Sequence, residues 1–258
     1  GELGAGRTPE PLPETGPAEI ATVNASFNRM VADLAQSERD RAVLLAGISH
    51  DLRTPLTRLR LEVELNELPP ETRANFVADL AQMDQIVAQF LDYARSEPAQ
   101  DKAAVDLAAL LEQALEASRL PRDPTVHIER RIEAGLRIDA YPVELSRALA
   151  NLLANAERYG RDPQSGRLDL TVALRATDEA VLVEIADRGP GVEAAKVDEL
   201  LRPFVRGDAA RGGVMGAGLG LAIVERVARL HGGRLALAGN SPTGLRATLR
   251  LPRNAARR

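Results

Sequence analysis

The chain has 258 residues, of which 45% are hydrophobic and 27% charged, and its formal net charge is −4. This is the composition of a globular protein, and the length suffices for more than one domain. Because there is no cysteine, a disulfide framework and a thiolate zinc site are excluded, and the small net charge gives no reason to expect direct binding to nucleic acid.

The first 19 residues contain Gly and Pro too densely for a helix or a central strand, which predicts a connector. Apolar residues then recur at 3-4-3-4 spacing, which predicts a coiled-coil helix. These residues are Ile20, Val23, Phe27, Met30 and Leu34. The pattern loosens over 37–41 and resumes over 45–63, so we expect the helix to continue with a shifted register.

Leu68, Pro69 and Pro70 should end this helix, because proline lacks the amide proton and disfavours helical geometry in the residue before it. A second helix is expected over about 71–95, where apolar residues again follow a 4-3-4-3 spacing. A lone hairpin of two such helices leaves its apolar stripes exposed. Pairing of two copies into a four-helix bundle, and therefore a homodimer, is the expected way to bury them.

After residue 100 the pattern changes to alternating strands and helices, which predicts an α/β or α+β second half. Strands are expected at 125–130, 168–175, 180–186, 234–238 and 245–251. Helices are expected at 106–118, 142–159 and 218–231. The segment 188–217 is long, rich in glycine and without apolar periodicity, which is typical of a functional lid.

His50 lies in the sequence SHDLRTPL on the first helix. An isolated histidine is more often structural, but imidazole is also a nucleophile that accepts a phosphoryl group at neutral pH. Asp51 can hold the imidazole tautomer or take its proton, and Thr54 one turn along can position water for the reverse hydrolysis. Pro55 should bend or loosen the helix here. The segment resembles the phosphoacceptor box of sensor histidine kinases, in the form used by the osmosensing, EnvZ-like branch.

A second constellation is NLLANAERYG, on the helix expected at 142–159. Asn151 and Asn155 stand four residues apart on one face, and amide oxygens can ligate Mg²⁺ beside water and phosphate oxygens. Arg158 can clamp phosphates, and Tyr159 can flank a purine. Either asparagine alone could equally be structural. The segment resembles the N box of the histidine-kinase ATP domain, which implies that Asn155 holds Mg²⁺ and that Asn151 assists.

The strand expected at 180–186 delivers Asp187 to its end, and Gly189 and Gly191 permit close approach of the backbone. A carboxylate at this place can accept a hydrogen bond from the amino group of adenine. Many turns share such a pattern, which here resembles the G1 box of the same family.

Two further motifs follow in the lid segment. Phe204 and Arg206 resemble the F box, and the alternative is a loop anchored by one buried Phe. A glycine motif then opens the next helix, where backbone amides at a helix N-terminus can seat phosphates. Its residues are Gly216, Gly218, Leu219 and Gly220. A G-x-G-x-G motif alone could be a Rossmann fragment, but no strand is expected directly before it. The motif matches the G2 box.

His127 and His231 have no comparable neighbours. His127 falls in an expected strand. His231 falls at the C-terminus of an expected helix, just before two glycines, where a cation or a capping role is expected.

Five boxes thus occur in the order of the family. The resemblance implies an α+β chain with a partial HAMP module over 1–40 (connector and second helix). A dimerisation and histidine-phosphotransfer hairpin over 41–98 would follow, and then a Bergerat-type (GHKL) α/β-sandwich ATP-binding domain over 101–254. It implies ATP and Mg²⁺ as cofactors, phosphorylation of His50, and transfer of the phosphoryl group to an Asp of a cognate, OmpR-like response regulator.

No apolar run reaches the roughly 18 to 20 residues of a membrane-spanning helix. Because only half of a HAMP module is present, we expect the parent protein to be anchored through a missing N-terminal part at the cytoplasmic face of the bacterial inner membrane. Two other functions stay open. One is an ATP-driven machine of the gyrase or chaperone kind, which shares the nucleotide fold. The other is a degenerate kinase that serves as a dimeric scaffold.

Overall fold

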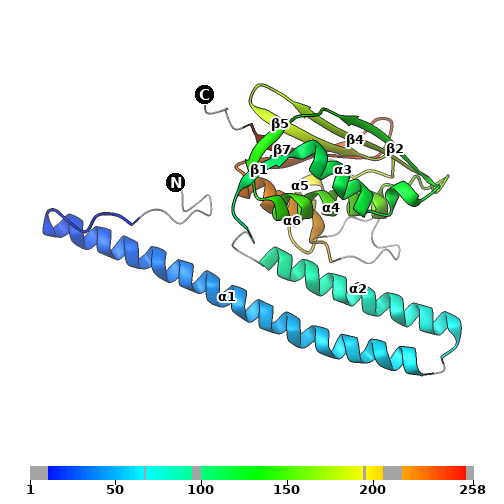
Figure 1. Cartoon of the computed structure of the whole chain (residues 1–258), viewed down its shortest axis with the longest axis horizontal. Coiled ribbons are helices and arrows are strands. Elements are labelled where there is room, and N and C mark those ends of the chain that lie inside the picture. The colour runs from blue at the N-terminus through cyan, green and yellow to red at the C-terminus, as the bar shows by residue number, and fades with distance from the viewer. Residues whose placement is uncertain (1–10, 67, 95–99, 194–195, 206–216, 254–258) are drawn as a thin grey trace. The chain divides into compact units, whose positions relative to one another are not determined.

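The computed structural model describes residues 11–253 except 67, 95–99, 194–195 and 206–216, and for His50 and several of its neighbours it describes the backbone alone. The chain divides into two compact units, Gly1–Glu97 and Pro98–Arg258 (Figure 1). The first is helical and the second is built on a sheet.

The helical unit is a hairpin of two helices, α1 (Ala18–Leu65) and α2 (Pro70–Ala94). The prediction that the first helix continues through 37–41 is confirmed, because α1 is one helix of 48 residues. It begins at Ala18, two residues before the predicted start, since Pro17 stands just before the first turn, where its fixed φ is tolerated. The predicted stop is confirmed as well, and Asn66 closes α1 by donating from Nδ2 to the Glu62 carbonyl oxygen at 2.7 Å.

Before α1, the connector runs back along the helix. The backbone of Leu12 exchanges hydrogen bonds with the side-chain amide of Asn28, at 2.8 and 2.9 Å. One turn earlier on α1, Asn24 donates from Nδ2 to the carbonyl oxygen of Pro13 at 2.6 Å. Two asparagines at helical spacing therefore hold an extended segment against the first part of α1, where Val31 is among the few buried side chains of this unit.

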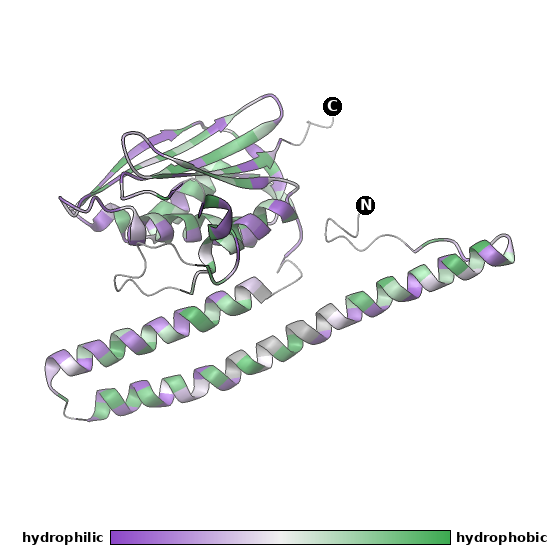
Figure 2. Ribbon diagram, turned by 180° about the vertical axis from the view of Figure 1, so that it is seen from behind, coloured by the Kyte–Doolittle hydropathy of each residue, from purple (hydrophilic) through white to green (hydrophobic). Residues whose placement is uncertain are grey.

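The hairpin exposes large apolar side chains along both helices, and Figure 2 shows how often hydrophobic residues recur there. On α1, Ile48, Leu52 and Leu59 are 46–50% exposed, and on α2 Phe76 and Met83 are 48% and 51% exposed. Such a surface is expected to be covered in the assembled protein. Neither helix, nor any other in the described part of the chain, is both long and apolar enough to cross a membrane.

The second unit is a two-layer α/β sandwich, as predicted. Five strands form one sheet in the order β2-β4-β5-β7-β6, in which β2 and β4 are parallel and the other pairs antiparallel. Their bounds are β2 Val126–Ile132, β4 Leu168–Ala176, β5 Ala180–Ala186, β6 Arg234–Gly239 and β7 Leu245–Pro252. Helices α3 (Leu107–Ala117), α4 (Pro142–Tyr159) and α6 (Gly220–Leu230) cover one face of the sheet (Figure 1).

The sequence missed two strands and two short helical turns. Strands β1 (Ala103–Asp106) and β3 (Arg137–Ala140) pair only with each other, and four residues are too few for an alternating pattern to stand out. The helical turns are η2 (Leu120–Arg122) and α5 (Val197–Leu200). The helix predicted from 218 begins only at Gly220, because Gly218 has a φ of +68° and lies outside helical geometry.

Leucine side chains from both layers form the core, and Leu249 at the centre of β7 is completely buried. Replacing Leu249 by Ala is expected to lower the free energy of unfolding of the second unit by about 2–5 kcal/mol, because a cavity remains in a close-packed interior. Denaturant unfolding of the chain measures the loss. The neighbouring Thr248 side chain points to the open face of the sheet, so Thr248→Ala should lower the free energy of unfolding much less. An equal loss of stability in both variants would contradict the buried position of Leu249.

Candidate functional site

The residue predicted to be the phosphoacceptor lies in the C-terminal half of α1. Residue 50 is helical, Pro55 lies inside the same helix, and Asp51 and Thr54 are exposed. Beside them, Arg53 of α1 pairs with Asp84 of α2, with Nε to Oδ1 at 3.3 Å. The side chain of His50 is outside the described structure, so its contacts stay a prediction, as does the local bending at Pro55.

Helix α4 presents Asn151, the first asparagine of the second constellation, toward the start of α6. Asn151 donates from Nδ2 to the Arg147 carbonyl oxygen at 2.9 Å, one turn back on its own helix. A Cβ added to Gly220 would lie 3.3 Å from the Oδ1 of the same amide. Asn155 follows one turn later and is half-buried. The structure thus brings the N box and the start of α6 together.

The backbone just before α6 lies next to residues 204 and 205, which belong to the segment expected to form a lid. The Phe204 N–H donates to the Gly218 carbonyl oxygen at 3.0 Å. A Cβ on Gly218 would lie 2.7 Å from the carbonyl oxygen of Val205, so the contact needs glycine, while Leu219 is completely buried. Phe204 is 59% exposed and has a φ of +64°, so the reading of a loop anchored by one buried Phe is wrong. Arg206 and Gly216 lie outside the described residues.

Asp187 follows β5, as predicted, and is only 6% exposed. The two hydrogen bonds that its carboxylate accepts from described residues both end at Oδ1, from the N–H groups of Gly189 and Leu245 at 3.0 Å each. No described residue donates a hydrogen bond to Oδ2. Burial raises the pKa of Asp187 above its ordinary value, and the two N–H donors partly offset that rise because they stabilise the charged form.

Close backbone contacts join this turn to the end of α4. A Cβ on Gly160 would lie 2.6 Å from the Asp187 Cβ, and one on Gly189 would lie 2.6 Å from the carbonyl oxygen of Tyr159. A Cβ on Gly191, whose φ is +73°, would lie 2.9 Å from the Gly244 carbonyl oxygen. Tyr159 therefore lies beside the Asp187 turn, on the same end of α4 as Arg158. No sequence pattern gives Gly160 or Gly244 a role at this turn; their glycine identity is the only signal that points to the close contacts.

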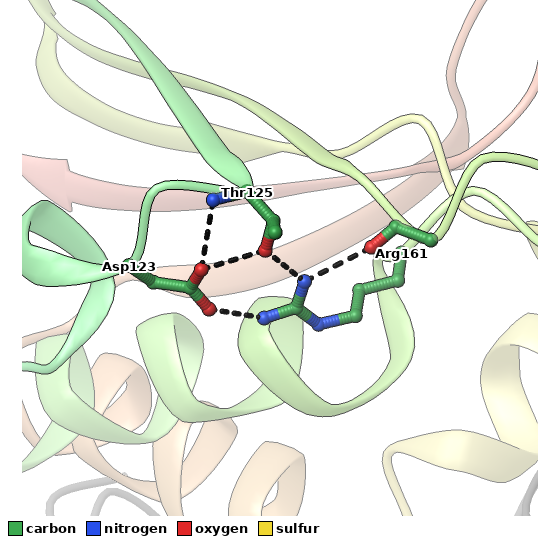
Figure 3. A network of polar contacts seen from close by, with 4 residues as sticks. Asp123, Thr125 and Arg161 are labelled. Carbon is green, nitrogen blue, oxygen red and sulfur yellow. Dashed lines mark hydrogen bonds and ion pairs between the residues drawn. The ribbon is translucent and has the colours of Figure 1, made fainter.

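The loop after α4 is tied to the strand β2 by the network in Figure 3. Arg161 donates from Nη2 to Asp123 Oδ2 at 2.7 Å and from Nη1 to Thr125 Oγ1 at 2.8 Å. Hydrogen bonds from the side chain and backbone of Thr125, and then that from Arg161, lower the pKa of Asp123 to about 2. The network anchors the C-terminal end of α4 beside Gly160.

In the described part of the chain, no group of three or more His, Asp or Glu residues could hold a metal ion. The oxygen donors that α4 offers at this site are the amides of Asn151 and Asn155, to which a bound nucleotide and solvent would add phosphate and water oxygens. That donor set is the one that Mg²⁺ accepts, and Asn151 Oδ1 and Asn155 can supply the amide oxygens.

His231 has a structural role away from these groups. Its Nε2 accepts the Tyr141 N–H at 3.0 Å, so the proton is on Nδ1, which donates to the Val227 carbonyl oxygen at 2.8 Å. Burial is the main cause that lowers the pKa of His231. The predicted capping role is confirmed, and the predicted cation is wrong, because both bonds require a neutral ring.

Acid should destabilise the second unit through this histidine. Since the folded-state pKa of His231 is below the unfolded value of about 6.5, the unfolded chain takes up the proton first as the pH falls. The contribution of neutral His231 to the stability of the folded state is complete above a pH of about 6.5 and is lost progressively as the pH falls below that value. The free energy of unfolding, measured with a chemical denaturant between pH 7 and 5, should fall less steeply for His231→Asn than for the wild type. The exposed control variant His127→Gln should show the same pH dependence as the wild type. An unchanged slope in His231→Asn would contradict the neutral assignment.

Two family models match the chain. Residues 40–99 match the His Kinase A (phospho-acceptor) domain, and residues 140–255 match the histidine kinase-, DNA gyrase B- and HSP90-like ATPase. The chain belongs to the sensor histidine kinase family. The match at 40–99 distinguishes this kinase from the other ATPases that share the nucleotide fold.

Curated relatives of the kinase agree. The sensor histidine kinase GtrS of Pseudomonas aeruginosa is 34% identical over 98% of this chain and 50% of its own length. The histidine-protein kinase/phosphatase MprB of a Mycobacterium species is 33% identical over 91% of this chain and 47% of its own. The chain thus spans about half the length of these relatives. The crystal structure of full-length ShkA in complex with AMPPNP matches with a TM-score of 0.65 and 27% identity, over 82% of this chain and 46% of that one.

Proposed function

We propose that this chain uses ATP with Mg²⁺ to phosphorylate His50 and then passes the phosphoryl group to an Asp of a response regulator. The observation that carries the proposal is the closeness of Asn151 Oδ1 to Gly220 at the start of α6, where a Cβ added to the glycine would lie 3.3 Å from that oxygen. It places an amide oxygen beside helix-terminal N–H groups, an arrangement that suits phosphates and a hard cation.

The adenine end of the site is assigned to the Asp187 turn. Oδ2 of the carboxylate would accept a hydrogen bond from the exocyclic amino group, and Tyr159 would flank the ring. Gly189 and Gly191 keep side chains out of this space, which supports the assignment because their backbone lies against the end of α4 and the β6–β7 loop.

The phosphate end is assigned to α4 and the start of α6. Asn155, assisted by Asn151, would hold Mg²⁺, which when bound neutralises charge on the phosphates. Arg158 and the N–H groups of Gly218, Leu219 and Gly220 would bind the phosphate oxygens. Gly216, Phe204 and Arg206 would complete the site from the lid segment.

At His50 a ring nitrogen would form a bond to the γ-phosphorus while the bond from that phosphorus to the bridging oxygen breaks, and ADP leaves. The proton on the other ring nitrogen then passes to Asp51 or to solvent. In the reverse sense, Thr54 would position a water that hydrolyses the phosphorylated regulator. MprB is named a kinase/phosphatase, which supports this second activity.

The assembly follows from the exposed apolar residues of α1 and α2. We propose a homodimer in which two hairpins form a four-helix bundle, with an OmpR-like regulator as the partner, as in the EnvZ-like branch. The asparagine-held connector supports a partial HAMP module over 1–40. The parent protein would be anchored at the inner membrane and face the cytoplasm.

The function is tested by incubating the chain with Mg²⁺ and ATP labelled at the γ-phosphate. The protein should acquire label that is labile to acid and stable to alkali, as expected for phosphohistidine, and should lose it to a purified regulator. Steady ATP hydrolysis without labelled protein would favour the gyrase-like or chaperone-like machine. Failure to bind ATP would favour the scaffold.

A further inference from the structure

A loop from a distant part of the chain holds the turn at Asp187. The Asp187 N–H donates to the Leu245 carbonyl oxygen at 2.9 Å, and the Leu245 N–H returns a bond to the carboxylate Oδ1 at 3.0 Å. The carbonyl oxygen of Asp187 accepts a third bond, from Nδ2 of Asn240 at 2.7 Å. Three polar groups of one residue are therefore bonded to the first residue of β7 and to the loop that precedes it.

Asn240 is itself held in one orientation. Its backbone N–H donates to the Gly244 carbonyl oxygen at 2.9 Å, and its Oδ1 accepts from Arg246 Nη2 at 3.0 Å. Because guanidinium is a pure donor, the amide oxygen must face Arg246 and the NH₂ group must face Asp187. The half-buried Asn240 side chain therefore acts as a bridge with a fixed direction.

Gly244 brings the loop into direct contact with the same peptide. A Cβ at this position would lie 2.0 Å from the Asp187 carbonyl oxygen and 2.9 Å from the Arg188 Cα, and its φ is +115°. No side chain fits between the loop and the turn there. The hydrogen bond from Asn240 thus acts on backbone that has little room to move.

We infer that Asn240 is a positioning residue for recognition of the base: it fixes the peptide after Asp187 and thereby the direction of the carboxylate Oδ2. This inference rests on the role proposed above for Asp187. A carboxylate accepts from the amino group at the 6-position of adenine but faces an acceptor oxygen at that position of guanine. A fixed Oδ2 therefore favours ATP over GTP, and a carboxylate free to turn discriminates less.

The near-isosteric variant Asn240→Asp tests this directly. It keeps an acceptor for Arg246 but sets an oxygen against the Asp187 carbonyl in place of the donor. Dissociation constants for ATP and GTP, measured by calorimetry on the whole chain with excess Mg²⁺, should show ATP binding weakened about tenfold, the effect of losing one buried hydrogen bond, and GTP binding little changed. Asn240→Ala should behave similarly. Arg246→Ala removes the contact to Asn240 Oδ1 together with the ion pair to Glu184, but it leaves the Asn240 donor to the Asp187 carbonyl oxygen in place, so ATP binding should stay within about twofold of the wild type.

Two outcomes would overturn the inference. One is ATP binding by Asn240→Asp that matches the wild type; the other is an equal loss for ATP and GTP, which indicates general loosening. The variant Asp187→Asn distinguishes a failure of the role inferred for Asn240 from a failure of the role proposed for Asp187 in binding adenine. If that variant narrows the ATP preference while Asn240→Asp does not, Asn240 alone is misassigned. If Asp187→Asn leaves the preference for ATP over GTP unchanged, Asp187 does not recognise the base, and the positioning role inferred for Asn240 is then wrong as well.

Discussion

His50→Gln is expected to bind ATP as tightly as the wild type and to incorporate no phosphate. The nucleotide groups lie in the second unit, whereas residue 50 lies on α1 of the first, so binding and acceptance should separate. Removing a covalent nucleophile costs on the order of a thousandfold or more in rate. The measurement is label retained on the protein after incubation with ATP labelled at the γ-phosphate, beside a calorimetric dissociation constant for ATP.

The exposed His127 on β2 supplies a matched control. His127→Gln makes the same chemical change at the surface of the second unit and should be labelled at the wild-type rate. Thr54→Ala should also be labelled normally but should lose the capacity to dephosphorylate the regulator. Label that survives in His50→Gln would show that another residue is the acceptor.

Asn155→Ala is expected to reduce autophosphorylation by about a hundredfold to a thousandfold, as when one preorganised polar group is removed from a catalytic site. Because the Asn155 amide is assigned to the metal ion, the autophosphorylation rate should be reduced even at saturating Mg²⁺. Raising the ATP concentration should not restore the rate. Initial rates of labelling at increasing ATP measure it. The hairpin is unaltered, so Asn155→Ala should still accept a phosphoryl group from another active site.

The control for this variant is Glu157→Ala, on the same helix. Glu157 lies on the face of α4 opposite Asn155, in line with the exposed residues Ala150 and Ala154. Its replacement should leave the autophosphorylation rate within about twofold of the wild type. Mixed dimers of His50→Gln with Asn155→Ala subunits extend the test. Label on the Asn155→Ala subunit means transfer between subunits, and no label means transfer within one. A normal rate in Asn155→Ala alone would remove Asn155 from the site.

Much of the secondary structure of this chain can be predicted from the sequence because its causes are local. Heptad spacing and the prolines at 69 and 70 predict the hairpin, since apolar periodicity and the missing amide act within one or two turns. Alternation predicts β4, β5 and β7, which carry one buried face each. Asn151 and Asn155 fall on one face of α4 because four residues make about one helical turn.

The sequence alone thus determined the two-part organisation and the family. Only the tertiary structure revealed that Asn240 and Gly244 hold the turn at Asp187, more than 50 residues away in the chain. It likewise decided that β2 pairs parallel to β4 and that His231 is neutral. The physical reason is that these features depend on which distant backbones approach closely enough to exclude a side chain or share a proton, and no local pattern encodes that distance.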